Sequence, residues 1–219
     1  GATWNATGVY FSTEYKPAKP LVLNLGVRWN QVRSETDYRS NPFTEAFGVQ
    51  KLKNNAFTYG LGGVYRFNRS TSMRMNLSSA FRAPNIDDLG KVFDSEPGSV
   101  VIPNPNLKPE LAQTIEIGIR KRFDRSFMID AAMYYSTLND ALIRRNTVLN
   151  GQSQLLYRGE LSQLQSIQNA ASAEVAGIEW SAYGHLSRKL SYRILGTYTS
   201  GKEIDDSGRS NSLRHAPPF

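Results

Sequence analysis

Residues 21–30 read LVLNLGVRWN and alternate between apolar and polar side chains with a period of two. Successive side chains of an extended strand point to opposite faces, so this stretch would present one apolar face and one polar face. The apolar face would hold Leu21, Leu23, Leu25, Val27 and Trp29, and the polar face Asn24, Gly26, Arg28 and Asn30. The alternation predicts a β-strand that lies between two different environments.

The same period recurs in segments of about ten residues, longer than the five or six that are usual for strands of soluble proteins. We predict eight antiparallel strands, near Thr7–Tyr15, Leu21–Asn30, Phe57–Phe67, Met73–Arg82, Thr114–Arg120, Phe127–Ser136, Gly177–Ala182 and Leu190–Tyr198. No helix is expected to interrupt them, so the chain reads as one domain. Their polar faces carry charged residues that would meet water: Arg28, Arg66, Arg74, Glu116, Arg120, Glu179 and Arg193.

The expected connections alternate in length. Short turns are predicted at Lys16–Pro20, Asn68–Thr71, Phe123–Ser126 and Leu186–Lys189. Long polar connections are predicted at Gln31–Asn55, Arg82–Lys108, Asp140–Ser172 and Ser200–Pro217. Short periplasmic turns and long extracellular loops are typical of outer-membrane β-barrels, because one rim meets ligands. Aromatic residues near the predicted strand ends suggest two membrane-interface girdles: Tyr15, Phe67, Phe123 and Phe127, and Trp29, Phe57, Phe81 and Tyr135.

The composition excludes several classes of protein. The 219 residues are 40% hydrophobic and carry a net charge of +7, with no cysteine and no apolar run long enough for a membrane helix. Lysine and arginine are spread along the chain rather than clustered, so we expect no nucleic-acid partner. Without cysteine there is no disulfide framework or thiolate metal site. Alternation alone also fits a soluble β-sandwich whose apolar face is its core, and that alternative stays open.

Two proline-containing boxes flank the second long connection. The first is FRAPN at residues 81–85, and the second is NPNLKPE at residues 104–110. Proline cannot continue a strand ladder, so Pro84, Pro105 and Pro109 would shape the junction between strand and loop. Arg82 falls on the polar face near the long-loop rim, where its guanidinium is suited to a carboxylate ligand. Catalysis finds no support, because no nucleophile and base share a face.

With these boxes, with Gly177-Ile178-Glu179 and with His215-Ala216-Pro217-Pro218, the chain resembles the TonB-dependent outer-membrane receptors. The resemblance implies an all-β antiparallel transmembrane barrel of about 22 strands, of which about eight are present. Residues 1–219 would be a segment of the C-terminal barrel domain, with a plug domain upstream of Gly1 and closing strands downstream of Phe219. The implied function is energy-coupled import of an iron complex through outer-membrane lipid, with the TonB complex acting through the plug.

Within the family, the paired boxes look most like the heme and hemoglobin receptor branch, whose intervening loop commonly supplies a histidine to heme iron. Residues 85–103 contain neither histidine nor tyrosine, so that ligand is absent here. The candidate ligand-binding residues are Phe81, Arg82, Asn85, Asn104, Asn106 and His215. The expected ligand is heme, free or from a heme protein, and next a siderophore. No metal site intrinsic to the protein is expected, and the alternatives are a passive porin and a soluble β-sandwich binding module.

Overall fold

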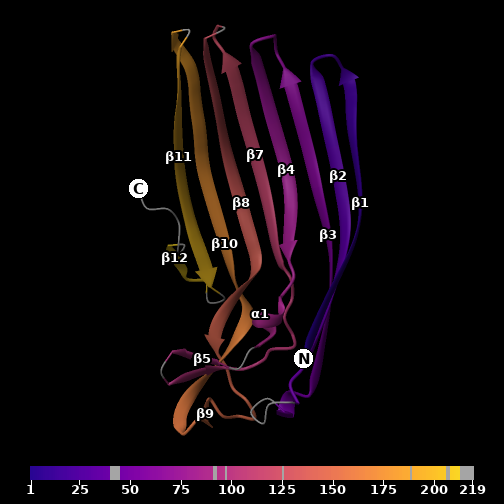
Figure 1. The fold of residues 1–219 in the computed structure, drawn as a ribbon, viewed down its shortest axis with the longest axis vertical. Coiled ribbons are helices and arrows are strands. Elements are labelled where there is room, and N and C mark those ends of the chain that lie inside the picture. Colours follow the sequence, from indigo (N-terminus) through magenta and orange to yellow (C-terminus); the bar gives the residue numbers. More distant parts are fainter. Residues whose placement is uncertain are drawn as a thin grey trace.

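The computed structural model describes residues 1–39, 45–90, 93–96, 98–124, 126–187, 189–205 and 208–212. Eight long strands lie side by side in a single curved antiparallel sheet (Figure 1). In sheet order they are β1 (Ala2–Ala18), β2 (Leu21–Asp37), β3 (Val49–Arg66), β4 (Thr71–Arg82), β7 (Glu110–Arg122), β8 (Phe127–Asn146), β10 (Glu160–Ser187) and β11 (Leu190–Asp205). The eight long strands predicted from the alternation are therefore confirmed.

Smaller elements fill the connections at one end of the sheet. They are η1 (Glu45–Phe47), α1 (Ile86–Gly90), β5 (Phe93–Glu96), β6 (Ser99–Val101), β9 (Gln154–Tyr157) and β12 (Ser210–Ser212). Strand β6 runs parallel to β10, and β9 pairs with β10 in antiparallel fashion. The prediction of an uninterrupted strand pattern was wrong at α1. None of the helices among the described residues is long and apolar enough to cross a membrane.

The four short turns gather at the top of Figure 1 and the long connections at the bottom, as the alternating lengths predict. We call these the short-turn end and the long-loop end. The predicted loops Gln31–Asn55 and Asp140–Ser172 were too long, however. Strand β2 continues to Asp37 and pairs there with Val49 at the start of β3, while β8 and β10 pair as far as Asn146 and Gln165. The β2 extension, QVRSETD at residues 31–37, has a single apolar residue, Val32, so no apolar alternation marks it.

The cross-strand register places the predicted apolar faces on one side of the sheet, which we call the outward face. Leu25 lies opposite Leu61, which lies opposite Leu77, and Ile117 lies opposite Met133. Many of these side chains are exposed, as Met133 is at 59% and Phe57 at 61%. A large apolar surface in contact with water would be unfavourable, so this face is built to contact lipid.

Charged residues set the limits of the outward apolar band. Lys121 lies opposite Ile129 near the short-turn end, and Glu174 lies opposite Thr137 toward the long-loop end. From Ile129 to Thr137 the strand rises about 27 Å, or about 21 Å along the membrane normal for a strand tilted by about 40°. That span is close to the apolar band of about 25 Å that is usual in these barrels.

The girdle residues Trp29 and Phe57 face each other in mid-strand rather than at the strand ends. They therefore mark the membrane boundary, and the sheet continues beyond it. There four buried apolar residues of the long-loop end form a cluster that we call the outer core: Val100, Ile102, Tyr157 and Leu164. Phe47, Leu149 and Leu155 pack against it.

Candidate functional site

Arg82, the last residue of β4, holds the two proline-containing boxes together. Its Nε donates to Oε2 of Glu110, the last residue of the second box, which lies directly opposite it on β7. Its Nη1 donates to Oδ2 of Asp88 in α1 at 2.7 Å. We call Arg82, Asp88 and Glu110 the rim junction. Charge-assisted hydrogen bonds of this kind are among the stronger ones in proteins, so they fix how the loop leaves the sheet.

Asn85 begins α1 through a reciprocal pair of hydrogen bonds. The Asp88 backbone N–H donates to Asn85 Oδ1 at 2.8 Å, and the Asn85 N–H donates to Asp88 Oδ2 at 2.9 Å. This is the arrangement of a capping box, which satisfies otherwise unpaired N–H groups at a helix start. Asn85 therefore places Asp88, and Asp88 in turn meets Arg82.

The return of the loop is fixed by amide side chains. Asn104 Nδ2 donates to the Ile167 carbonyl at 2.8 Å, and Asn104 Oδ1 accepts from the Asn106 N–H at 3.0 Å. Asn169 in β10 donates to the Lys108 and Asp140 carbonyls at 2.9 and 2.7 Å and accepts from the Lys108 N–H at 2.8 Å. Nothing in the sequence singled out Asn169, because it lies in a polar stretch with no motif.

A groove of about 570 Å³ on the inner face lies beside the rim junction. Residues from β1 to β4 line it, among them Trp4, Arg28, Thr58, Phe81 and Arg82. Arg28 lies flat against the backbone of Gly8, where an added Cβ would come within 2.7 Å of its Nη2. Its Nε donates to Asn30 Oδ1 at 2.7 Å. The groove thus presents two guanidinium groups and an indole to the inside of the wall.

The predicted site residues separate into three sets. Phe81 and Arg82 contribute to the groove, while Asn85, Asn104 and Asn106 make hydrogen bonds that shape the loop. His215 lies outside the described residues. The sequence missed Trp4 and Arg28 as groove residues, because their strands lie far from the boxes along the chain.

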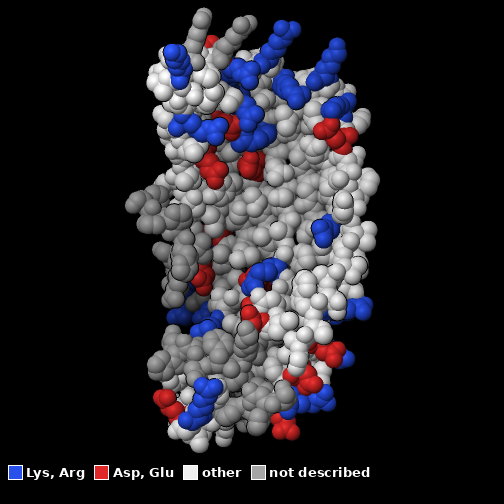
Figure 2. Space-filling model, in the orientation of Figure 1, with Lys and Arg blue, Asp and Glu red and all other residues white. Residues whose placement is uncertain are grey.

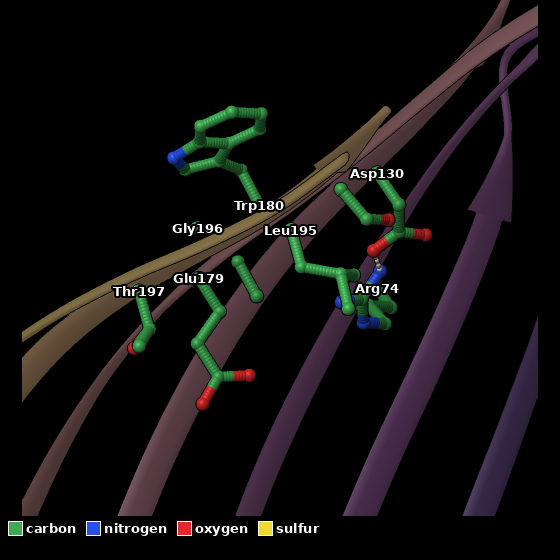
Figure 3. Close-up of a pocket in the computed structure, with 9 residues that line it drawn as sticks. Arg74, Asp130, Glu179, Trp180, Leu195, Gly196 and Thr197 are labelled. Carbon is green, nitrogen blue, oxygen red and sulfur yellow. Dashed lines mark ion pairs between the residues drawn. The ribbon is translucent and has the colours of Figure 1, made fainter. Parts of the chain in front are cut away.

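A second charged cluster lies on the inner face toward the short-turn end. Arg74 donates to Glu116 at 3.1 Å and pairs with Asp130 at 2.9 Å, and Arg120 donates to the other oxygen of Asp130 at 2.7 Å. We call these four residues the inner cluster. In Figure 3, Trp180 lies on the opposite side of its strand from Glu179, and a dashed line marks the Arg74–Asp130 ion pair. The inner cluster joins β4, β7 and β8 across the polar face.

In the described part of the chain, no group of three or more histidine, aspartate or glutamate side chains is placed to hold a metal ion. At the β7–β8 turn, Asp124 accepts hydrogen bonds from the side chain and the backbone of Ser126, and these lower the pKa of its carboxyl group. That carboxylate stabilises the turn.

The family model for the TonB dependent receptor-like β-barrel matches residues 2–219. The chain belongs to this family. Family membership places it in the bacterial outer membrane and confirms the predictions of a β-barrel wall and of a protein that is not an enzyme. The alternative of a soluble β-sandwich is thereby excluded.

Relatives and solved structures agree with this assignment. A probable hemoglobin and hemoglobin-haptoglobin-binding protein of Haemophilus influenzae is 25% identical over 209 residues, covering 89% of this chain and 20% of the relative. The hemoglobin-haptoglobin utilization protein B of Neisseria meningitidis is also 25% identical, covering 90% and 26%. The copper transporter OprC aligns with a TM-score of 0.74 at 17% identity, covering 99% of this chain and 31% of that structure. The chain thus spans about a quarter of these relatives' length.

Proposed function

We propose that this chain is part of the barrel domain of a receptor that imports an iron complex by TonB-coupled transport, with heme as the first candidate ligand. In the complete protein, a plug domain would precede this segment and closing strands would follow it. Several relatives bear names that refer to hemoglobin or heme, including the Haemophilus influenzae heme/hemopexin utilization protein C, which is 25% identical over 96% of this chain. A vitamin B12 transporter from Vibrio vulnificus matches a shorter part.

The groove beside the rim junction is the observation that carries the heme proposal. Heme is a flat aromatic ring system that bears two carboxylates. Arg28 and Arg82 supply planar cations suited to carboxylates, and Trp4, which is 49% exposed, supplies an aromatic surface. Arg82 is already bonded to Glu110 and Asp88, so Arg28 is the more available cation of the two. The groove would therefore recognise the ring and its carboxylates, with the iron ligated elsewhere or by the carrier protein.

The test is a hemin titration of the full-length receptor in detergent. We expect a shift of the Soret band and saturable binding that Arg28→Gln weakens about tenfold, which is the effect of losing one charged hydrogen bond. Lys53→Gln, an exposed cation on the outward face, is the matched control and is expected to leave the affinity unchanged. A full-length receptor that produces no Soret shift with hemin would exclude heme.

A ferric siderophore is the second candidate. The lack of histidine and tyrosine in residues 85–103 favours a ligand whose iron is already fully coordinated. A strain that lacks the receptor gene, complemented with the wild-type gene, separates the two candidates. Growth on hemin as the sole iron source supports heme, and growth only on ferric siderophores supports the second candidate. Passive entry of both without TonB would instead indicate the porin.

A further inference from the structure

Basic side chains gather at the short-turn end of the wall, as Figure 2 shows. Three of them follow one another along the rim: Arg69 in the β3–β4 turn, Lys121 near the end of β7 and Lys189 in the β10–β11 turn. All three are exposed, and none takes part in an ion pair among the residues that the structure describes. We call them the basic rim.

The basic rim lies at the edge of the outward apolar band. Lys121 follows Ile115, Ile117 and Ile119 on the outward face of β7. Its Nζ lies 5.0 Å from the centre of the Phe123 ring, and that ring stacks on Phe127 with centres 5.3 Å apart. Aromatic side chains favour the interface between lipid and water, so Phe123 and Phe127 fix the depth of the Lys121 charge at the level of the headgroups.

The spacing of the three cations follows from the sheet. Each short turn is separated from the next by two strands, and neighbouring strands lie about 4.8 Å apart. The β3–β4, β7–β8 and β10–β11 turns therefore follow at intervals of about 10 Å along the rim, with Arg69 and Lys189 in the outer two and Lys121 at the strand end before the middle one. The carboxylate in the middle turn, Asp124, accepts hydrogen bonds from the Ser126 and Phe127 N–H groups. It stabilises the turn and is not ion-paired with Lys121.

The opposite edge of the apolar band is different. There the outward-facing Glu174 and Lys202 pair with each other at 3.1 Å, so the charges cancel. At the short-turn edge, in contrast, the outward Lys121 has no ion-pair partner among the described residues. The outward Arg33 and Lys53 at the long-loop end lie beyond Trp29 and Phe57, outside the apolar band. In outer-membrane barrels the short turns face the periplasm.

We propose that the basic rim binds the phosphate headgroups of anionic phospholipids in the periplasmic leaflet. Cations placed just outside the apolar part of a bilayer attract anionic lipid, and the attraction decreases within a screening length of the surface. The stacked Phe123 and Phe127 would pack against the first part of the lipid chains, while Lys121 and its two neighbours meet the phosphates. This inference does not depend on which ligand the receptor carries.

The test is lipid retention by the full-length receptor. The receptor in detergent is mixed with equal amounts of phosphatidylglycerol and phosphatidylethanolamine, and the retained lipids are measured by native mass spectrometry. We expect the wild type to prefer phosphatidylglycerol, and a triple variant with Arg69→Gln, Lys121→Gln and Lys189→Gln to reduce that preference by about tenfold or more at low salt. The matched control removes the same charge at the long-loop end, with Arg33→Gln, Lys51→Gln and Lys53→Gln.

Every result of the lipid-retention experiment either supports or overturns the proposal. Loss of the preference in the rim variant with retention in the control supports the proposal. A wild type without preference, or equal losses in both variants, overturns it. If the triple variant does not fold, as judged by its heat-modifiable mobility on a gel, Lys121→Gln alone replaces it, with an expected loss of about fivefold. Unchanged retention in that single variant would then overturn the proposal.

Discussion

At the long-loop end the wall is held by buried side chains, whereas at the short-turn end it is held by tight turns and the strand ladder. Val100 and Leu164 in the outer core are at most 1% exposed, and Glu110 of the rim junction retains 12%. Arg74 and Arg120 of the inner cluster remain 34% and 58% exposed. Irregular loops need side chains to fix them, while strands joined by tight turns are already fixed by backbone hydrogen bonds. Substitutions should therefore cost more at the long-loop end.

Leu164→Ala in the outer core should give the largest effect. Removing a fully buried leucine side chain costs about 2–5 kcal/mol. Hydrogen exchange in the full-length receptor should show faster exchange at the Ile102 amide, which donates to the Gln165 carbonyl at 2.8 Å. Leu161→Ala, on the same strand but 61% exposed, is the control and should change little. Equal effects of the two substitutions would show that the outer core does not hold the long-loop end together.

Glu110→Ala should have the next largest effect. Its Oε2 bonds Arg82 and its Oε1 accepts from the Leu142 N–H at 2.7 Å, so both would lose a partner. Charged hydrogen bonds contribute about 1.5–3 kcal/mol each, and we expect the local stability of the loop to fall by an amount near the lower value. Hydrogen exchange over residues 83–108 is the measurement. Glu35→Ala, which breaks only the exposed pair with Lys51, should leave that segment unchanged.

Gly118→Ala tests the inner cluster and should have a smaller effect. An added Cβ would come within 2.5 Å of Arg74 Cζ, so the arginine must move away from its carboxylates. Because the cluster is partly exposed, we expect a loss of about 1 kcal/mol or less, seen as a lower thermal midpoint. Gly60→Ala is the control, since nothing lies within 4 Å of its added Cβ. If Gly118→Ala lowered stability more than Glu110→Ala does, the proposed difference between the two ends of the sheet would be contradicted.

Asp124→Ala should give the smallest effect, and one that depends on pH. The hydrogen bonds from Ser126 lower the pKa of the folded carboxyl group below its ordinary value. The stabilisation is therefore complete above the ordinary value and is lost as the pH falls through the lowered one. The difference in thermal midpoint between wild type and variant should persist at pH 5–8 and shrink in stronger acid. A difference that is the same at every pH would contradict this account.

The sequence predicted the membrane-spanning part of the fold well, because there lipid on one face and water on the other impose a period of two. It failed beyond the membrane boundary, because the extension of β2 to Asp37 is built almost entirely of polar residues, although Val32, Ser34 and Thr36 are buried there. The short helix after Asn85 was missed because the reciprocal hydrogen bonds between Asn85 and Asp88 that begin it are visible only in the structure.

The candidate site was only partly predictable. Arg82 could be placed near the rim from its box, but its pairing with Asp88 and Glu110 required the register between β4 and β7. Arg28 and Trp4 line the groove because the folded sheet brings β1 and β2 beside the end of β4. No pattern along the chain reports that proximity.

The position of Trp180 on the outward face makes it a natural optical probe of the bilayer. Its ring lies over Gly196, and its strand neighbour is Ala131, well inside the apolar band. Of the two other tryptophans, Trp29 lies at the outer membrane boundary and Trp4 faces the groove. Bromine atoms placed at chosen depths along the lipid chains would quench Trp180 and Trp29 emission at different depths, while a ligand in the groove would affect Trp4. The three indoles together would report lipid depth and ligand occupancy from one emission spectrum.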